Sequence, residues 1–197
     1  MPVRPIVQLG DPVLTQPAKR VHRVDDSIDR LIQDMIDTML DAPGSGLAAP
    51  QIGVPLRIIT THIDEELHVI VNPEIVWMSE ETEIAEEGCL SIRGYAGPVE
   101  RALRCRVRGI DRRGKKLKLK AEDWLARCLQ HEVDHLNGIL YIDRVVDKST
   151  IHRVDEDYEV EPEETMRETV PAAEEQSAPE AMASPVGARE TGDESLR

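Results

Sequence analysis

The stretch His131-Glu132-Val133-Asp134-His135 has the residue types and spacing of a metal site. On a helix, His131 and His135 stand one turn apart on one face, about 6 Å along the axis, so both imidazoles can bind one metal ion. Glu132 is offset by about 100° and can act on a water molecule at that ion without binding the ion itself. Ordinary helices also carry two histidines at this spacing, so a third ligand has to decide between the two interpretations.

The chain has three cysteines, and Cys89 suits the third position best. Cys128 lies one helical turn before His131, and its short side chain would have to reach past that histidine, so we interpret it as a small buried hydrophobic residue. The same interpretation applies to Cys105, which falls on the apolar side of an alternating segment. Cys89, beside the flexible Gly88, supplies a thiolate, and one sulfur with two imidazole nitrogens suits Zn²⁺ or Fe²⁺. Three protein ligands leave a fourth position open for water, which is typical of a catalytic site.

Two alternatives concern the ligands. Peptidases with an H-E-x-x-H helix often take a third ligand, a glutamate, from beyond that helix, and Glu156 and Glu159 have a suitable spacing. Both lie at the edge of the acidic stretch that follows, where a rigid ligand is not expected. A structural metal site in a binding module is the alternative from another class of protein. It requires a fourth protein ligand that completes the coordination.

The segment PGSGLAAPQIG, residues 43–53, is rich in glycine and lacks the following Gly-Lys-Ser/Thr of a phosphate-binding loop. One interpretation is a tight turn after a helix. The other is a close approach of the backbone to a ligand at Gly44 and Gly46, with Gln51 as a fixed amide donor. The residues alone leave both interpretations open.

Two helices are predicted around these segments. The first has apolar residues at helical spacing, begins at a cap within residues 25–27 and ends at residues 43–44, which are Pro-Gly; we expect it to pack against a sheet. The second carries the two histidines and runs from Asp123, a suitable N-cap, to Asn137. Gly138 follows as the left-handed residue that ends a helix.

Short runs of β-branched and apolar residues predict strands at residues 57–60 and 68–76. Residues 103–108 alternate between apolar residues and arginines, a turn follows at 111–114, and a returning strand passes through 117–119, which predicts an antiparallel hairpin. Its arginines could bind nucleic acid, but the solvated face of a hairpin carries such charges as well.

The charge of the chain is unevenly distributed. Of the net −14, residues 155–197 account for −11, with 14 acidic residues against three basic ones, which leaves −3 for residues 1–154. An acidic chain without a basic stripe argues against nucleic-acid binding through phosphates. The stretch 155–197 consists of Glu, Pro, Ala, Ser and Thr without periodicity, which predicts a disordered acidic tail after a catalytic domain of residues 1–154.

Three cysteines are too few for a disulfide framework and favour a reducing compartment. The N-terminus has no apolar signal region, and no run approaches the roughly 18 apolar residues of a membrane span. These features predict a soluble, cytoplasmic protein.

Three motifs together, GSGLAAPQ, EGCLS and HEVDHLNG, resemble those of the peptide deformylases, in the same order and at a consistent spacing over residues 1–150. The longer stretches EGCLSIRGY and DWLARCLQHEVDHLNGILYIDRV are similar to the subclass that includes organellar deformylases. The commoner bacterial form has a proline soon after the second motif, where this chain has Arg93, Gly94 and Tyr95.

The resemblance implies an α+β fold in which antiparallel β-sheets pack around a central metal-binding HExxH helix, with an N-terminal helix. The implied metal ligands are Cys89, His131 and His135. The implied catalytic residues are Glu132 as general acid and base, Gln51 and the Leu90 N–H as holders of the oxyanion, and Gly46. The implied lining of a methionine pocket is Trp124, Arg127 and Cys128.

The implied activity is hydrolysis of the N-terminal formyl group from formyl-methionine of newly synthesised polypeptides, with release of formate. The resemblance suggests one divalent metal, Fe²⁺ as the native ion, while Zn²⁺ or another divalent ion suits the same ligands. The expected partners are formyl-Met nascent peptides at the ribosome, with no direct reading of nucleic acid and no membrane. A general H-E-x-x-H peptidase is the alternative enzyme.

Overall fold

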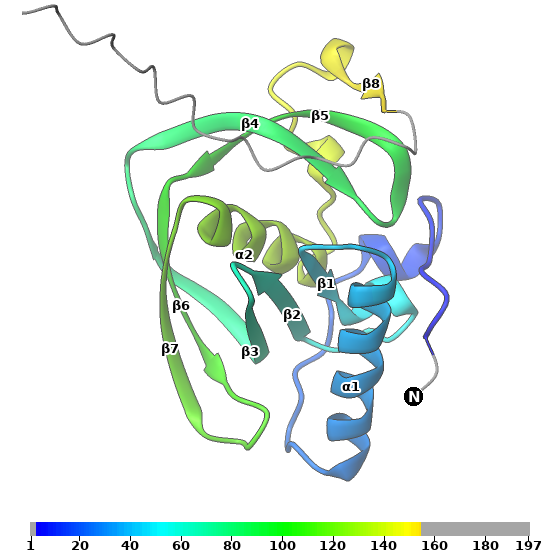
Figure 1. Ribbon diagram of the computed structural model, residues 1–197, viewed down its shortest axis with the longest axis vertical. Coiled ribbons are helices and arrows are strands. Elements are labelled where there is room, and N and C mark those ends of the chain that lie inside the picture. Colours follow the sequence, from blue (N-terminus) through cyan, green and yellow to red (C-terminus); the bar gives the residue numbers. More distant parts are fainter. Residues whose placement is uncertain (1–2, 155–197) are drawn as a thin grey trace, which may run out of the picture. The chain divides into compact units, whose positions relative to one another are not determined.

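The computed structural model describes residues 3–154, which form an α+β fold of two antiparallel sheets and two α-helices (Figure 1). The helices are α1 (Asp26–Asp41) and α2 (Asp123–Leu136). A five-stranded sheet has the order β1 (Gly46–Ala48), β2 (Ile58–Ile63), β3 (Glu66–Met78), β6 (Arg104–Ile110) and β7 (Lys116–Glu122). A three-stranded sheet consists of β4 (Thr82–Cys89), β5 (Ile92–Ala102) and β8 (His152–Arg153). The predicted acidic tail, residues 155–197, lies outside the described residues.

Helix α1 confirms the first predicted helix. Its N-cap is Asp25, whose carboxylate accepts hydrogen bonds from the backbone N–H groups of Ser27 and Ile28. One face is buried against the five-stranded sheet, through Ile32, Met35, Ile36 and Met39. Leu40, which the apolar spacing also included, is 50% exposed at the end of the helix.

Helix α2 confirms the second predicted helix but begins differently from the prediction. The N-cap is Glu122, with no side-chain hydrogen bond, while Asp123 is the first helical residue and has φ +49°. The predicted capping role of Asp123 is therefore wrong. The other end follows the prediction, because Asn137 is the C-cap and Gly138 adopts φ +73°.

Strands β6 and β7 form the predicted hairpin. Val107 faces Leu119 across the ladder, and Cys105 and Val107 are buried against α2. The arginines lie on the outer face, where two of them pair with glutamates of the same surface: Arg104 with Glu81 and Arg108 with Glu74.

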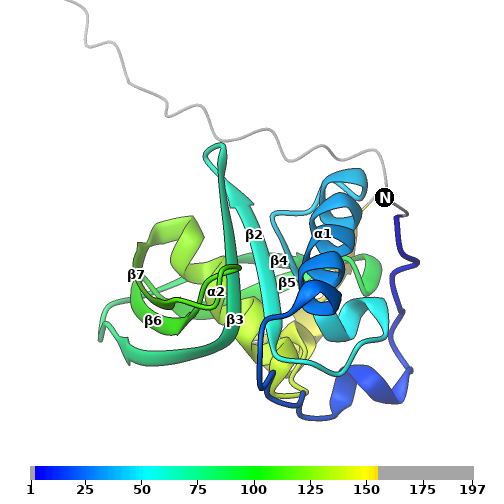
Figure 2. The same ribbon diagram turned by 90° about the horizontal axis from the view of Figure 1, so that it is seen from below.

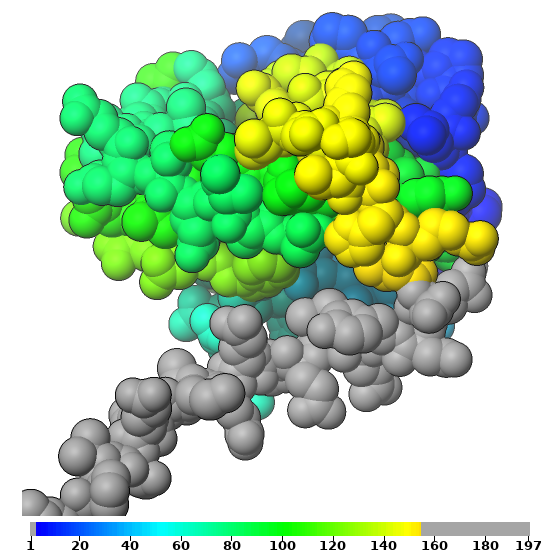
Figure 3. Space-filling view, turned by 90° about the horizontal axis from the view of Figure 1, so that it is seen from above, coloured from blue at the N-terminus to red at the C-terminus, as the bar shows by residue number. Residues whose placement is uncertain are grey.

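Strands β4 and β5 form a long hairpin that the residue pattern did not predict. The outward-facing residues of β4 are mostly exposed and polar, so the strand lacks the clear apolar alternation that marks β6. Strand β8 pairs with the edge of β5, and Figure 3 shows its segment in yellow, on the surface against the green strands.

Helix α2 occupies the centre of the fold, with β4 and β5 on one side and the five-stranded sheet on the other (Figures 1 and 2). Its apolar residues pack into a buried cluster together with β2, β3, β6 and β7. The two sheets therefore enclose one central helix.

Within residues 3–154, no helix combines the length and the apolar character needed to cross a membrane.

Candidate metal centre

Three donor side chains meet between the end of β4 and the C-terminal half of α2. The ligand atoms of Cys89, His131 and His135 all lie within 4.8 Å of one another. The Cys89 Sγ is 3.2 Å from the His135 Nε2, and the centroids of the two imidazole rings are 5.0 Å apart. The structure thus brings together the three residues that the sequence predicts as metal ligands, although they come from segments more than 40 residues apart.

The chemistry of this group fits a divalent metal. One sulfur and two imidazole nitrogens form a donor set for Zn²⁺ or Fe²⁺. Burial lowers the pKa of His135 well below its usual value, which favours the neutral imidazole that binds metals. The group has three candidate ligands among residues 3–154, and a tetrahedral metal held by them would keep a fourth position for a water molecule or substrate.

The other two cysteines are buried outside the ligand group, as the sequence predicted. Burial raises the pKa of the Cys105 thiol to about 11. Burial, followed by the charge of Glu132, raises the pKa of the Cys128 thiol well above its usual value. Both side chains are therefore neutral thiols at physiological pH. The rival ligands Glu156 and Glu159 lie outside the described residues.

Glu132 is the carboxylate beside the ligands. Its side chain is buried, and burial raises the pKa of Glu132 to about 7. Its Oε2 atom is buried without a hydrogen-bond partner among the described residues. A carboxyl group with a pKa near neutrality can both accept and donate a proton, which is what a general acid and base requires.

Gly46, in β1, allows the backbone to pass directly over this carboxylate. A Cβ at position 46 would lie 2.5 Å from the Glu132 Oε1 and 2.7 Å from the Cys128 Sγ, closer than a Cβ comes to a non-bonded atom in proteins. The glycine is thus required by a close approach at the site. This observation favours the second interpretation of the glycine-rich segment.

Gln51 lies in the short 3₁₀ helix η2 (Ala49–Ile52) directly after β1. Its Oε1 accepts a hydrogen bond of 2.8 Å from the Ala48 N–H, which fixes the amide group. Its Nε2 is 3.5 Å from the Cys89 Sγ and 3.3 Å from the Ser91 Oγ, so the amide donor is directed at the predicted ligand Cys89. Leu90 follows Cys89 in the tight turn between β4 and β5, where its carbonyl accepts a hydrogen bond of 3.1 Å from the Gln8 side chain.

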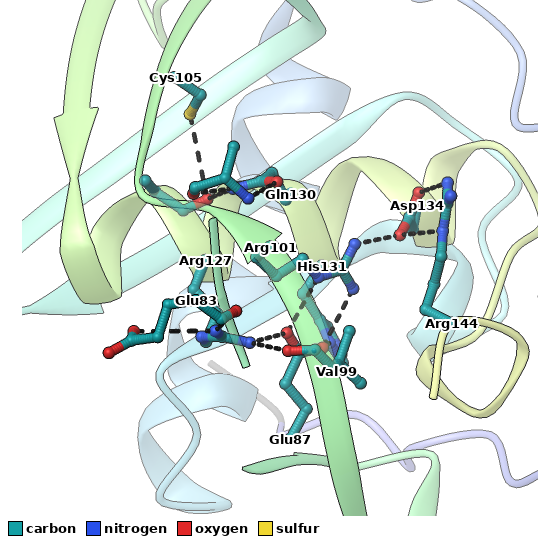
Figure 4. A network of polar contacts seen from close by, with 12 residues as sticks. Glu83, Glu87, Val99, Arg101, Cys105, Arg127, Gln130, His131, Asp134 and Arg144 are labelled. Atoms are coloured by element: carbon teal, nitrogen blue, oxygen red, sulfur yellow. Dashed lines mark hydrogen bonds and ion pairs between the residues drawn. The ribbon is translucent and has the colours of Figure 1, made fainter. Parts of the chain in front are cut away.

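The three residues assigned to a methionine pocket have different surroundings. Trp124 is 48% exposed in the first turn of α2, whereas Cys128 is buried beside Gly46. Arg127 is buried, and its guanidinium donates to Glu87 and to the Val99 carbonyl, each at 2.9 Å (Figure 4). The assignment of these residues to a pocket stays a prediction.

Sequence reasoning missed the buried charges behind His131. Glu87 Oε2 lies 2.9 Å from the His131 Nδ1, and Arg101 pairs with the same carboxylate (Figure 4). Burial alone would raise the pKa of Glu87, but the hydrogen bonds with His131 and Arg101 hold it at about 2. Glu87 belongs to the stretch EEGCLS around Cys89, which was the one signal for it, but nothing local in the sequence indicates its partners.

A cysteine sulfur and two imidazoles with a buried carboxylate beside them, on an α+β fold, are features of a metal-dependent hydrolase. A family model described as polypeptide deformylase matches residues 3–150. The chain belongs to the polypeptide deformylase family, whose members are metal-dependent hydrolases that remove the N-formyl group from newly synthesised polypeptides.

Individual relatives agree with the family model. The chain is 48% identical over 150 residues to the peptide deformylase of Bartonella quintana, in an alignment that covers 74% of this chain and 85% of the relative. It is 49% identical over 145 residues to the peptide deformylase of Acidothermus cellulolyticus, covering 74% and 80%.

Solved structures share the fold. A peptide deformylase from Synechococcus elongatus in complex with actinonin has a TM-score of 0.74 and 43% identity, covering 76% of this chain and 82% of that chain. The peptide deformylase from Thermotoga maritima has a TM-score of 0.73 and 40% identity, covering 75% and 100%. The α+β fold with two antiparallel sheets is therefore the fold of this family.

Proposed function

We propose that Cys89, His131 and His135 hold the metal of a peptide deformylase, and that Glu132 carries the protons of the reaction. The observation that carries this proposal is the meeting of the three donor atoms within 4.8 Å, with a buried carboxylate beside them. The substrate is the formyl-methionine that begins a newly synthesised polypeptide. The products are formate and a free N-terminal amine.

A divalent metal at these ligands supplies Lewis acidity, which allows a water molecule to ionise near neutral pH. Glu132 accepts the proton of that water at its carboxylate. The water oxygen then forms a bond to the formyl carbon, and the carbonyl oxygen gains negative charge. Breaking the C–N bond releases the amine, to which Glu132 returns the proton, so the carboxylate ends as it began.

Gln51 and Leu90 are proposed to stabilise the charge that develops on the formyl oxygen. The Gln51 amide is fixed by its hydrogen bond with the Ala48 N–H, and its Nε2 already points at the ligands. The Leu90 N–H belongs to the peptide bond that follows Cys89, so the turn places it next to the same site. Fixed donors of this kind need no reorganisation during the reaction, and losing one typically costs about 10²–10³ in turnover.

Gly46 limits the space beside Glu132. Its backbone lies over Glu132 and leaves no room for a Cβ. A formyl group is the smallest acyl group, and a site this tight can exclude larger amides by shape. We propose that this exclusion separates the deformylase from a general H-E-x-x-H peptidase.

Finer features of the function are proposed from the family resemblance. Fe²⁺ is proposed as the native metal because the family resemblance suggests it. The donor set itself suits both Fe²⁺ and Zn²⁺. The enzyme is proposed to meet its substrates near the ribosome, because formyl-methionine is carried by newly made chains. Residues 1–154 are proposed as the catalytic domain.

Formate release tests the proposed function directly. We expect purified metal-loaded protein to release formate from formyl-Met-Ala-Ser and to leave the peptide bonds of acetyl-Met-Ala-Ser intact. Cleavage of internal peptide bonds without formate release would support the peptidase alternative. A metal that exchanges no water, together with no formate release, would support a structural metal site.

A further inference from the structure

The two histidine ligands are held in different ways. The Nδ1 of His131 lies 2.9 Å from the Glu87 Oε2, and its ring stacks on Tyr141 with the centroids 6.3 Å apart. The Nδ1 of His135 is buried and has no hydrogen-bond partner among the described residues. The same element therefore carries one imidazole with a fixed partner and one without, which makes His135 an internal reference for His131.

Glu87 is itself immobilised by two arginines. The Glu87 side chain is 4% exposed, and Arg101 binds both of its oxygens, with Nε to Oε1 at 2.9 Å and Nη2 to Oε2 at 3.0 Å. Arg127 adds a third hydrogen bond of 2.9 Å to Oε1. Both guanidinium groups are 5% exposed, so the carboxylate has little freedom to turn away from His131 (Figure 4).

The chain of charges continues beyond Arg101 into the histidine motif. The third nitrogen of Arg101, Nη1, donates to the Asp134 Oδ2 at 2.5 Å. Arg144 binds both oxygens of Asp134 from the other side, at 3.1 and 2.9 Å. Arg144 is 47% exposed, so the series Arg144, Asp134, Arg101, Glu87 and His131 runs from the surface to the metal ligands.

A gain in folding stability is not enough to explain the buried charges of Asp134, Arg101 and Glu87. Buried ion pairs lose most of their attraction to the cost of removing both charges from water, and apolar residues of similar volume often stabilise as well or better. A structural clamp between β4, β5 and α2 also requires no contact with the His131 ring. In metal sites, a carboxylate on the second nitrogen of a histidine fixes the tautomer and the orientation of the ring.

We propose that Glu87, held by Arg101 and Arg127, is the positioning residue of His131. By accepting the Nδ1–H, it leaves the Nε2 lone pair directed at the site that also contains the Cys89 Sγ. Asp134 extends the same role, because it fixes Arg101 from the side opposite Glu87. This inference rests on the proposed metal site, but it concerns metal affinity and ring orientation rather than the hydrolysis itself.

The test compares Glu87→Gln with Glu83→Gln. Both positions lie on β4 and both variants exchange a carboxylate for an amide. The Glu83 side chain is 59% exposed, and its Oε2 reaches only the edge of the cluster, 3.9 Å from the Arg127 Nη2. We expect Zn²⁺ affinity, measured by competition with a chromophoric chelator, to fall about 10–100-fold in Glu87→Gln. Affinity in Glu83→Gln should stay within about twofold, as expected for the loss of an exposed charge.

Glu87→Asp separates charge from position. The aspartate keeps the negative charge for the arginines but is one methylene shorter, so it cannot keep the 2.9 Å contact with the imidazole. We expect the free energy of unfolding of the apo protein to exceed that of Glu87→Gln, while Zn²⁺ affinity stays below that of the wild type. Wild-type affinity in folded Glu87→Gln or Glu87→Asp would overturn the proposal.

Nuclear magnetic resonance of the zinc-loaded wild type keeps the proposal testable if Glu87→Gln does not fold. A carboxylate partner shifts an imidazole N–H proton downfield, so the His131 Hδ1 should resonate downfield of the His135 Hδ1. A His131 Hδ1 that resonates at or upfield of the His135 signal would overturn the positioning role. Neither readout involves formate, so a failure of this proposal is distinguishable from a failure of the proposed function.

Discussion

Gly46 is the point at which the backbone comes closest to the proposed proton carrier. A methyl group there would overlap the Glu132 carboxylate at 2.5 Å, so Gly46→Ala must displace Glu132 or β1. We expect kcat for formate release to fall about 10²-fold, the usual effect of a displacement near 1 Å, while the metal content is retained. Steady-state kinetics with metal analysis measures both.

Gly44→Ala is the control for this change. A Cβ at position 44 would meet the Leu90 Cδ1 at 2.7 Å, which is the end of a flexible side chain that can move away. The loss of kcat in Gly44→Ala should therefore be much smaller than in Gly46→Ala. Equal activity of Gly46→Ala and the wild type would contradict the close approach to Glu132.

Cys89 is expected to be indispensable for metal binding, because its loss leaves two ligands. Cys89→Ala should bind less than a tenth of the metal found in the wild type when both are dialysed together and analysed by mass spectrometry. Cys128→Ala is the matched control, since Cys128 is a buried neutral thiol outside the ligand group. Full metal content in Cys89→Ala would contradict the ligand assignment.

Local chemistry explains how much of the site the sequence could predict. His131, Glu132 and His135 share one helix, so their relative placement follows from helical geometry alone. Cys89 could be chosen among three cysteines because Cys105 falls on the apolar side of an alternating segment and Cys128 would have to reach past His131. The position of Arg101 on Glu87 depends on the pairing of β4 with β5, which no local pattern in the chain indicates.

At the level of the elements, strands with a clear apolar pattern were predictable. The runs at 57–60 and 68–76 correspond to β2 and to part of β3, and the alternating segment corresponds to β6. Strand β6 alternates between buried apolar residues and exposed arginines, and its predicted hairpin with β7 is confirmed. Strand β4 has mostly exposed residues and buries Glu87 in place of an apolar side chain. A buried glutamate does not fit an apolar pattern, so the strand that carries Glu87 was among those that the sequence did not predict.

Gly138, at the end of α2, is predicted to stabilise the fold through two separate effects. It has φ +73°, and a Cβ there would lie 2.7 Å from the Thr15 carbonyl carbon. Gly114 has a similar φ of +78°, but its Cβ would meet nothing within 4 Å. Gly114→Ala should thus lower the free energy of unfolding by about 1–2 kcal/mol through backbone strain alone.

Gly138→Ala should lower the free energy of unfolding by more than Gly114→Ala does, because the overlap with Thr15 adds to the backbone strain. Urea unfolding of the two variants and the wild type under the same conditions measures the difference. Equal destabilisation by the two substitutions would show that the contact between η1 (Pro12–Thr15) and the end of α2 is looser than described.

For the whole molecule, the metal site and the proposed catalytic residues all lie within residues 3–154. A chain that ends at Val154 should therefore keep the metal content of the full chain and a kcat within about twofold, as for changes remote from the site. Metal analysis and formate release on both lengths test this expectation. Loss of metal on truncation would revive Glu156 or Glu159 as a ligand.

The central claim is that Glu132 moves the protons of the reaction without binding the metal. Metal content and formate release from formyl-Met-Ala-Ser, measured side by side for the wild type and Glu132→Gln, test it most directly. We predict one metal ion per chain in both proteins and a fall in kcat of about 10²–10⁴-fold in the variant, the usual contribution of a general acid and base. Formate release by Glu132→Gln at the wild-type rate, with the metal bound, would contradict the claim.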